Sequence, residues 1–86
     1  MIYTVVYTDE AKGHLATLWM EAGDRQAVAD ADNRIAEELR VDADRKGIPF
    51  GHFRIYSDDP LAVLYEVNAG DCMVRVVAVK RISEKG

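Results

Sequence analysis

Residues 60–81 decide the fold, and they read PLAVLYEVNAGDCMVRVVAVKR. Apolar residues recur at every second position from 61 to 67, which is typical of a strand with one buried face. Asn-Ala-Gly-Asp at 68–71 has the composition of a tight turn. The run Val-Val-Ala-Val at 76–79 is apolar without a break, which is typical of a central strand covered on both faces. The stretch therefore predicts a hairpin of strands over 61–67 and 72–82.

A third strand is predicted just before this hairpin. Residues 50–56, FGHFRIY, alternate between polar and apolar side chains. Ser-Asp-Asp-Pro at 57–60 is typical of a turn. One face of the strand is expected to carry His52, Arg54 and Tyr56. Residues 50–82 together predict an antiparallel meander of three strands.

The first half of the chain predicts one strand and two helices. Residues 2–8, IYTVVYT, are β-branched and aromatic, which favours a strand. Apolar residues at helical spacing predict helices over about 10–22 and from 24 to about 46, with Gly23 between them. The stripe of the first helix includes Leu15, Leu18 and Trp19, and Trp19 is expected in the core or between helix and sheet. The stripe of the second contains Ala27, Val28, Ala31, Ile35 and Leu39.

The order of elements predicts one α+β domain over residues 1–86, of type β-α-α-β-β-β. The short connection favours a helical hairpin, and this hairpin is expected to pack on one face of a mainly antiparallel sheet. Strand 2–8 is expected on an edge of the same sheet, and the pattern leaves its neighbour open.

Composition excludes several classes of protein. The net charge is −4, and residues 1–50 carry ten acidic and six basic side chains, so a nucleic-acid-binding face would have to be local and in the second half. The single cysteine, Cys72, excludes an internal disulfide. No apolar run approaches the roughly 20 residues of a membrane helix, and no signal peptide is visible, so we expect a cytoplasmic protein that does not contact a membrane.

Five stretches, in this order, resemble the RelE/ParE superfamily of toxins from toxin–antitoxin systems. They are the opening strand with a helix carrying Leu15, Leu18 and Trp19; a helix carrying Ala31, Ile35 and Leu39; GHFRI at 51–55; PLAVLYEV at 60–67; and VVAVKR at 76–81. The resemblance covers residues 2–82. It departs from the family pattern at Ala62, where the family's strand carries an arginine.

The resemblance implies one of two activities. RelE-like members cut messenger RNA on the ribosome without a metal ion, and ParE-like members inhibit DNA gyrase. Members of both kinds bind a cognate antitoxin, which neutralises them. If the chain is an enzyme, it is expected to be a metal-independent endoribonuclease with no cofactor. A non-catalytic interaction module of the same fold, which binds a protein partner or forms a homodimer, is the alternative.

The residues and the resemblance together indicate candidate site residues. Arg54 shares its predicted face with His52 and Tyr56, and a cation, an imidazole and a phenol in a row can hold phosphate and move a proton. His52 is the residue of this row that titrates near neutral pH. Lys80 and Arg81 point to opposite faces, so only one can join Arg54, and the resemblance favours Arg81. The alternative for all five is an ordinary polar surface.

The remaining titratable residues predict no further site. His14 and His52 have no cysteine at ligand spacing, so no metal site is expected. His14 is expected to face solvent. Tyr65 is expected in the core with its hydroxyl at the rim. Arg75 is expected to pair with Glu66 across the hairpin.

Overall fold

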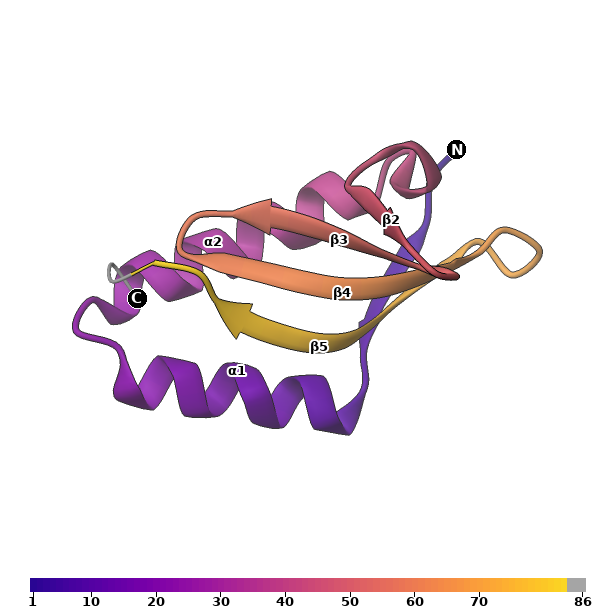
Figure 1. The fold of residues 1–86 in the computed structure, drawn as a ribbon. Helices are drawn as coiled ribbons and strands as arrows, with labels where there is room; N and C mark the ends of the chain where they lie inside the picture. The colour runs from indigo at the N-terminus through magenta and orange to yellow at the C-terminus, as the bar shows by residue number, and fades with distance from the viewer. Residues whose placement is uncertain (84–86) are drawn as a thin grey trace.

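The computed structural model describes residues 1–83 and has two helices on one side of a five-stranded sheet (Figure 1). The elements are β1 (Thr4–Tyr7), α1 (Asp9–Glu21), α2 (Arg25–Leu39), a 3₁₀ turn (Ala43–Arg45), β2 (Ile48–Phe50), β3 (Phe53–Asp58), β4 (Leu61–Asn68) and β5 (Met73–Arg81). The predicted α+β class and the order β-α-α-β-β-β are confirmed, with β2 as an additional short strand. Within residues 1–83, no helix is both long and apolar enough to cross a membrane.

The sheet has the order β1-β5-β4-β3-β2. The strands from β2 to β5 form antiparallel neighbours, while β1 pairs in parallel with β5, from Thr4 opposite Met73 to Tyr7 opposite Val76. The prediction that the first strand lies on an edge is confirmed. Its neighbour is β5, which is an inner strand of the sheet as predicted. The expectation that β5 is covered on both faces is wrong, because the helices lie on one side and Val77 and Ala78 are only half-buried.

The core lies between α2 and the sheet. Four of the five residues in the apolar stripe of α2 are fully buried, and they face alternate residues of β4 and β5. Its buried members are Val28, Ala31, Ile35 and Leu39, and their partners in the sheet include Leu61, Val63, Tyr65, Val74 and Val76. Burying an aliphatic side chain of this size stabilises the fold by about 1.5–3 kcal/mol, so this stripe is the main support of the layer.

α1 is held less firmly than α2. It is capped by Thr8, whose hydroxyl accepts from the Ala11 N–H at 3.1 Å. Ala11 is its one buried side chain, and Leu15 and Leu18 are half-buried. The prediction for Trp19 is wrong, because its side chain is 43% exposed, and the Arg25 guanidinium lies 4.8 Å from the ring centre.

α2 ends at Leu39, well before the predicted end near Lys46. The chain beyond it pairs with the first residues instead: the Tyr3 N–H donates to the Arg40 carbonyl at 2.6 Å, and Val41 bridges Ile2. Asp42 then adopts a left-handed conformation, with φ of 52°, which a helix cannot continue through. Pairing with a distant segment therefore overrides the local helical pattern.

The predicted strand over 50–56 is two strands. Gly51 has φ of +64° and, with His52, forms the two-residue turn between β2 and β3. Phe50 and Phe53 are paired directly across this turn. Glycine adopts such a left-handed turn without strain. Since His52 lies in the turn, it does not share a strand face with Arg54 and Tyr56, and that prediction is wrong.

A β-bulge in β5 exchanges the faces of its last residues. Leu64 pairs with Ala78 and Tyr65 with Val76, so the register skips Val77. An extra residue in one strand inverts the alternation beyond it. Val79 is consequently buried among the core residues, and the even-numbered Lys80 lies on the opposite face.

We expect the fold to lose stability in alkaline solution. Burial and a 2.6 Å hydrogen bond to Asp32 raise the pKa of Tyr7, and burial raises the pKa of Tyr65. A tyrosine whose pKa is raised in the folded state stabilises the fold fully at pH values below its pKa in the unfolded chain, which is about 10. This stabilisation is lost as the pH rises from there through the folded-state pKa. Urea titrations at increasing pH should show that the free energy of unfolding falls, and that it falls less steeply in the Tyr7→Phe variant. An equally steep fall in that variant would contradict the assignment to Tyr7.

Candidate functional site

The five predicted site residues lie in four different places, one of which is the β2–β3 turn that holds His52. Arg54 and Tyr56 pair with Tyr65 and Val63, which are core residues, so both face the helices. Lys80 pairs with Ala62 and lies on the face that the helices leave uncovered, which we call the open face. Arg81 pairs with the core residue Leu61 at the far end of β4.

Arg54 fastens the loop between α2 and β2 to the sheet. Its Nε donates to the Lys46 carbonyl at 2.5 Å and its guanidinium also reaches the Gly47 carbonyl at 3.4 Å. The guanidinium thus has two backbone acceptors and lies half-buried beneath the loop. A side chain engaged in this way positions the loop.

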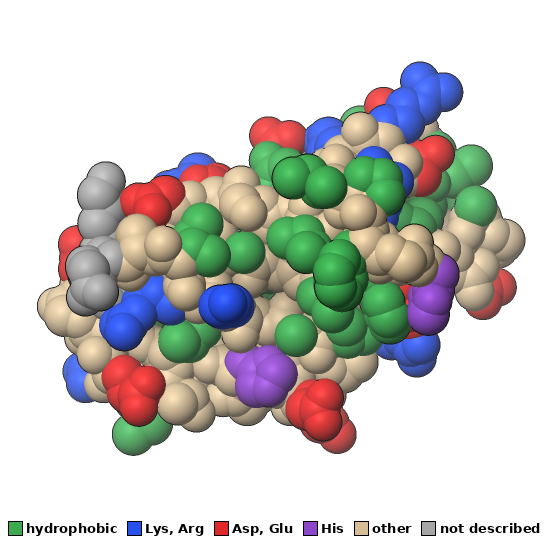
Figure 2. Space-filling model, in the orientation of Figure 1, with side chains coloured by type: hydrophobic (Ala, Val, Ile, Leu, Met, Phe, Trp, Pro, Cys, Tyr) green, Lys and Arg blue, Asp and Glu red, His purple; other side chains and the backbone are tan. Residues whose placement is uncertain are grey.

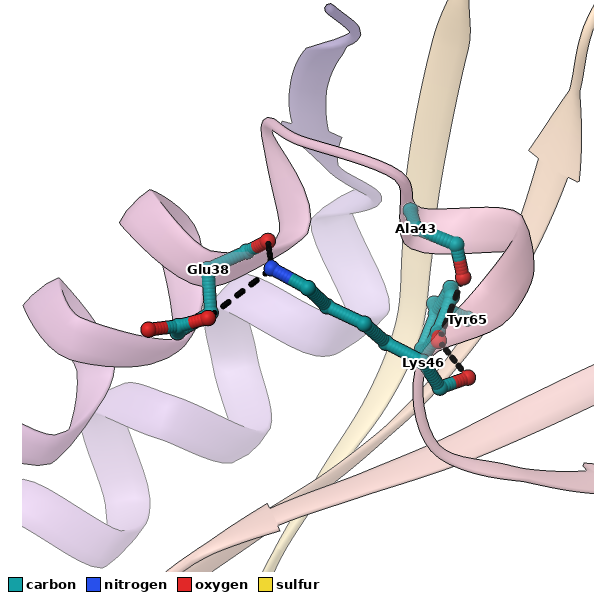
Figure 3. A network of polar contacts seen from close by, with 4 residues as sticks. All are labelled: Glu38, Ala43, Lys46 and Tyr65. Carbon is teal, nitrogen blue, oxygen red and sulfur yellow. Dashed lines mark hydrogen bonds and ion pairs between the residues drawn. The ribbon is translucent and has the colours of Figure 1, made fainter. Parts of the chain in front are cut away.

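Tyr65 supports the same loop from inside the core (Figure 3). Its hydroxyl oxygen lies 2.9 Å from the Ala43 carbonyl and 2.7 Å from the Lys46 carbonyl. Lys46 in turn donates from Nζ to the Glu38 carbonyl at 2.6 Å and to the Glu38 carboxylate at 2.8 Å. These contacts connect the end of α2, the loop and β4 into one polar network, and the Lys46 carbonyl accepts from both Tyr65 and Arg54.

The backbones of Arg54 and Arg81 lie apart on the sheet. Their partners on β4, Tyr65 and Leu61, are four residues apart, which corresponds to about 13 Å along the strand. The two arginines also lie on strands on opposite sides of β4. The backbone positions of the two arginines are therefore well separated, and their meeting in one site stays a prediction from the sequence.

His52 occupies an exposed position at the tip of the β2–β3 turn. Its ring lies 4.1 Å from that of Phe53 at a tilt of 35°, and its Nε2 lies 3.8 Å from the Glu66 carboxylate. Glu66 is already paired with Arg75, as the cross-strand spacing predicts. Within residues 1–83, no group of three or more His, Cys, Asp or Glu side chains is placed to hold a metal ion.

The open face carries an apolar patch, which we define by five side chains. It spans β2, β3 and β4, where adjacent strands place aliphatic and aromatic residues side by side (Figure 2). Its members are Ile48, Phe50, Phe53, Ile55 and Leu64. Ile48 is 71% exposed and Phe50 is 61% exposed, while the other three are half-buried. A patch of this kind on a small protein marks a surface for protein contacts.

The sequence holds a signal for part of this patch. The alternation in 50–56 places Phe53 and Ile55 on one face, opposite the polar face on which the site residues are predicted. Ile48 and Phe50 could not be placed without knowing that Gly51 begins a hairpin.

His14 has a structural contact that the sequence pattern does not indicate. It is exposed as predicted, but its Nδ1 accepts from the Val79 N–H at 3.3 Å, so α1 covers the edge of β5 beyond β1.

No protein-family model matches the sequence, and no curated protein matches it. Solved structures do. The RelBE2 toxin–antitoxin complex from Mycobacterium tuberculosis contains a chain that matches with a TM-score of 0.75 at 20% identity, over 94% of this chain and 99% of that one. A chain of the chromosomal ParDE system from P. aeruginosa matches with a TM-score of 0.66 at 14% identity, over 95% and 98%.

A third match comes from an archaeal protein. A chain of the RelE–RelB complex from Pyrococcus horikoshii matches with a TM-score of 0.65 at 16% identity, over 96% of this chain and 98% of that one. The three matches span nearly all of each chain, so the likeness concerns the whole domain. The chain therefore shares its fold with chains of the RelBE2, ParDE and RelE–RelB structures, in agreement with the fold that the resemblance in the sequence implies.

Proposed function

We propose that this chain is the RelE/ParE-type toxin of a toxin–antitoxin pair and that it acts by binding a target protein with its open face. The likeness to chains from RelBE and ParDE toxin–antitoxin structures supports the first part. It also supports a cognate antitoxin as the partner that neutralises the chain. DNA gyrase, the target implied by the resemblance to ParE, is the first target to test.

The exposed apolar patch is the observation that carries the proposal. Phe50 and Ile48 project from β2 with most of their surface in water. Burying one such side chain against a partner is worth about 1.5–3 kcal/mol, and aromatic anchors of this kind dominate protein interfaces. A toxin that inhibits by contact needs such a surface.

Messenger RNA cleavage is the alternative, with Arg54, Arg81, His52, Lys80 and Tyr56 in catalytic roles. Stabilising the charge on a phosphate transition state needs donors that converge on it. Arg54 is engaged with backbone carbonyls and Arg81 lies at the other end of β4. Lys80 lies on the face opposite to Arg54, and Ala62 replaces the family's strand arginine. These positions favour the protein-binding activity.

Replacing Phe50 with aspartate is expected to abolish growth arrest when the chain is induced in a bacterial host. The carboxylate would have to be desolvated in the interface, while the folded domain keeps it in water. Met20→Asp is the matched control, because Met20 is 68% exposed and lies on α1, away from the open face. Growth with each variant is measured, with and without the neighbouring open reading frame, and circular dichroism verifies folding.

Three readouts separate the alternatives. Loss of arrest in Phe50→Asp but not in Met20→Asp, together with blocked gyrase supercoiling by the purified wild type, supports the proposal. Truncated transcripts on ribosomes that disappear in the Arg54→Ala, Arg81→Ala double variant would replace it with messenger RNA cleavage. Harmless expression of the wild type without the neighbouring frame would remove the toxin assignment altogether.

A further inference from the structure

One stretch of sheet edge is left uncovered in residues 1–83, and it belongs to β1. In the parallel pairing with β5, the N–H groups of Thr4 and Thr8 donate to the Cys72 and Val76 carbonyls at 2.9 and 3.0 Å. Alternate residues of such a strand point their backbone groups away from the neighbour. The N–H and carbonyl groups of Val5 and Tyr7 therefore point outward from the sheet.

The other edges of the sheet are protected. β2 has three residues, and its middle residue, Pro49, has no N–H to offer an added strand. β5 extends beyond β1, and there the Val79 N–H is already bound by His14 of α1. The outer side of Tyr3 is occupied by Arg40, through the 2.6 Å hydrogen bond described above. The free edge is therefore confined to the strand between Tyr3 and the start of α1.

This free edge is self-complementary about Val6. Tyr3, where the segment 40–42 blocks the edge, and Asp9, where α1 begins, are equally distant from Val6 in the chain. A two-fold axis at Val6 would place Val5 opposite the second copy's Tyr7, and the reverse. Antiparallel residues paired in this way exchange both of their backbone hydrogen bonds, so every outward group of the edge would be satisfied.

Charge supports the same arrangement. Residues 2–8 carry no charged side chain, so the edge lacks the lysines that commonly prevent strand addition. The same two-fold axis brings the second copy's Asp9 to the end of the free edge, where Arg40 lies beside Tyr3. Asp9 and Glu10 form an acidic first turn in α1, and the Arg40 side chain is exposed and only loosely paired with Glu37 at 3.5 Å. The contact occurs twice by symmetry.

From these observations we infer that the occupant of the β1 edge is a second copy of this chain, which continues the sheet across a two-fold axis at Val6. Such an interface is isologous, because the same patch serves both subunits. The inference is independent of the toxin assignment. It uses the edge of the sheet, while the proposed target site uses the apolar patch at β2, β3 and β4.

Sedimentation of the purified chain from micromolar to millimolar concentration tests the inference. The wild type is expected to form a dimer, and Val5→Pro is expected to weaken it about tenfold or more, because one outward N–H is lost from each copy. Asp9→Arg and Arg40→Asp should each weaken the dimer, and the double variant should restore it. Circular dichroism identifies any variant that fails to fold, and the charge reversal tests the interface without altering the strand.

Amide hydrogen exchange locates the contact directly. The Val5 and Tyr7 amides are expected to exchange rapidly in dilute protein and slowly at high concentration. A monomer throughout the range, or a dimer that persists in folded Val5→Pro, would overturn the inference. Protection of these two amides only in the presence of the protein from the neighbouring open reading frame would also overturn it, and would assign the edge to that protein.

Discussion

Gly47→Ala is expected to lower the free energy of unfolding by roughly 2–5 kcal/mol. Gly47 has φ of +71°, and an alanine in this left-handed conformation costs roughly 1–2 kcal/mol. A Cβ atom there would also lie 2.4 Å from the Ile55 carbonyl oxygen and 3.1 Å from the Tyr65 hydroxyl, and relieving such an overlap costs about 1–3 kcal/mol. Urea denaturation of wild type and variant measures the difference.

Gly51→Ala is the matched control for this prediction. Gly51 is also left-handed, with φ of +64°, but a Cβ atom at this position has no neighbour within 4 Å. The control therefore carries the backbone cost of roughly 1–2 kcal/mol without the overlap. Equal losses in the two variants would show that the loop does not lie against β3 as described. Since a domain of this size has a total stability of only about 4–13 kcal/mol, the Gly47 variant is expected to lose a large share of its stability.

Tyr65→Ala is expected to cost roughly 3–5 kcal/mol, which is the usual loss for truncating a fully buried aromatic side chain. Tyr65→Phe separates the contribution of the hydroxyl and is expected to cost about 1–2 kcal/mol. A phenol has one hydroxyl hydrogen, so the hydroxyl donates to either the Ala43 or the Lys46 carbonyl at any moment. In Tyr65→Phe, the Lys46 carbonyl still accepts a hydrogen bond from Arg54.

A double-mutant cycle of Tyr65→Phe with Arg54→Ala tests whether the two residues act on one loop. Both donate to the Lys46 carbonyl, so their effects on the free energy of unfolding should not add. We expect a coupling of about 0.5–3 kcal/mol. Additive losses in the free energy of unfolding would mean that Arg54 does not support the loop. Such a result would favour the predicted role of Arg54 in catalysis.

The sequence was sufficient where a pattern is local and long. Ala31, Ile35 and Leu39 are buried as their helical spacing predicts, and the hairpin of β4 and β5 follows from alternation and a turn. The sequence was insufficient where pairing with a segment distant in the chain determines the local structure. The end of α2 depends on pairing of Val41 with Ile2, and this pairing leaves no periodic signal.

The site was predicted less well than the fold, for a specific physical reason. Assigning residues to faces assumes strict alternation, and one skipped residue at Val77 inverts that assignment for Lys80 and Arg81. A turn at Gly51 likewise removes His52 from the face of Arg54. The role of Arg54 was hidden because its acceptors, the carbonyls of residues 46 and 47, are backbone atoms that every residue possesses.

The pairing of β1 with β5 has a consequence for how the domain is made. The meander of β3, β4 and β5 closes through short turns, whereas β1 must await a partner at the other end of the chain. Contacts between residues so far apart in the sequence form slowly, because the chain loses the entropy of loop closure before the contact contributes any stabilisation. During synthesis, the uncharged strand β1 therefore emerges before β5 and stays unpaired until β5 has left the ribosome, so a chaperone or another nascent chain has time to contact it.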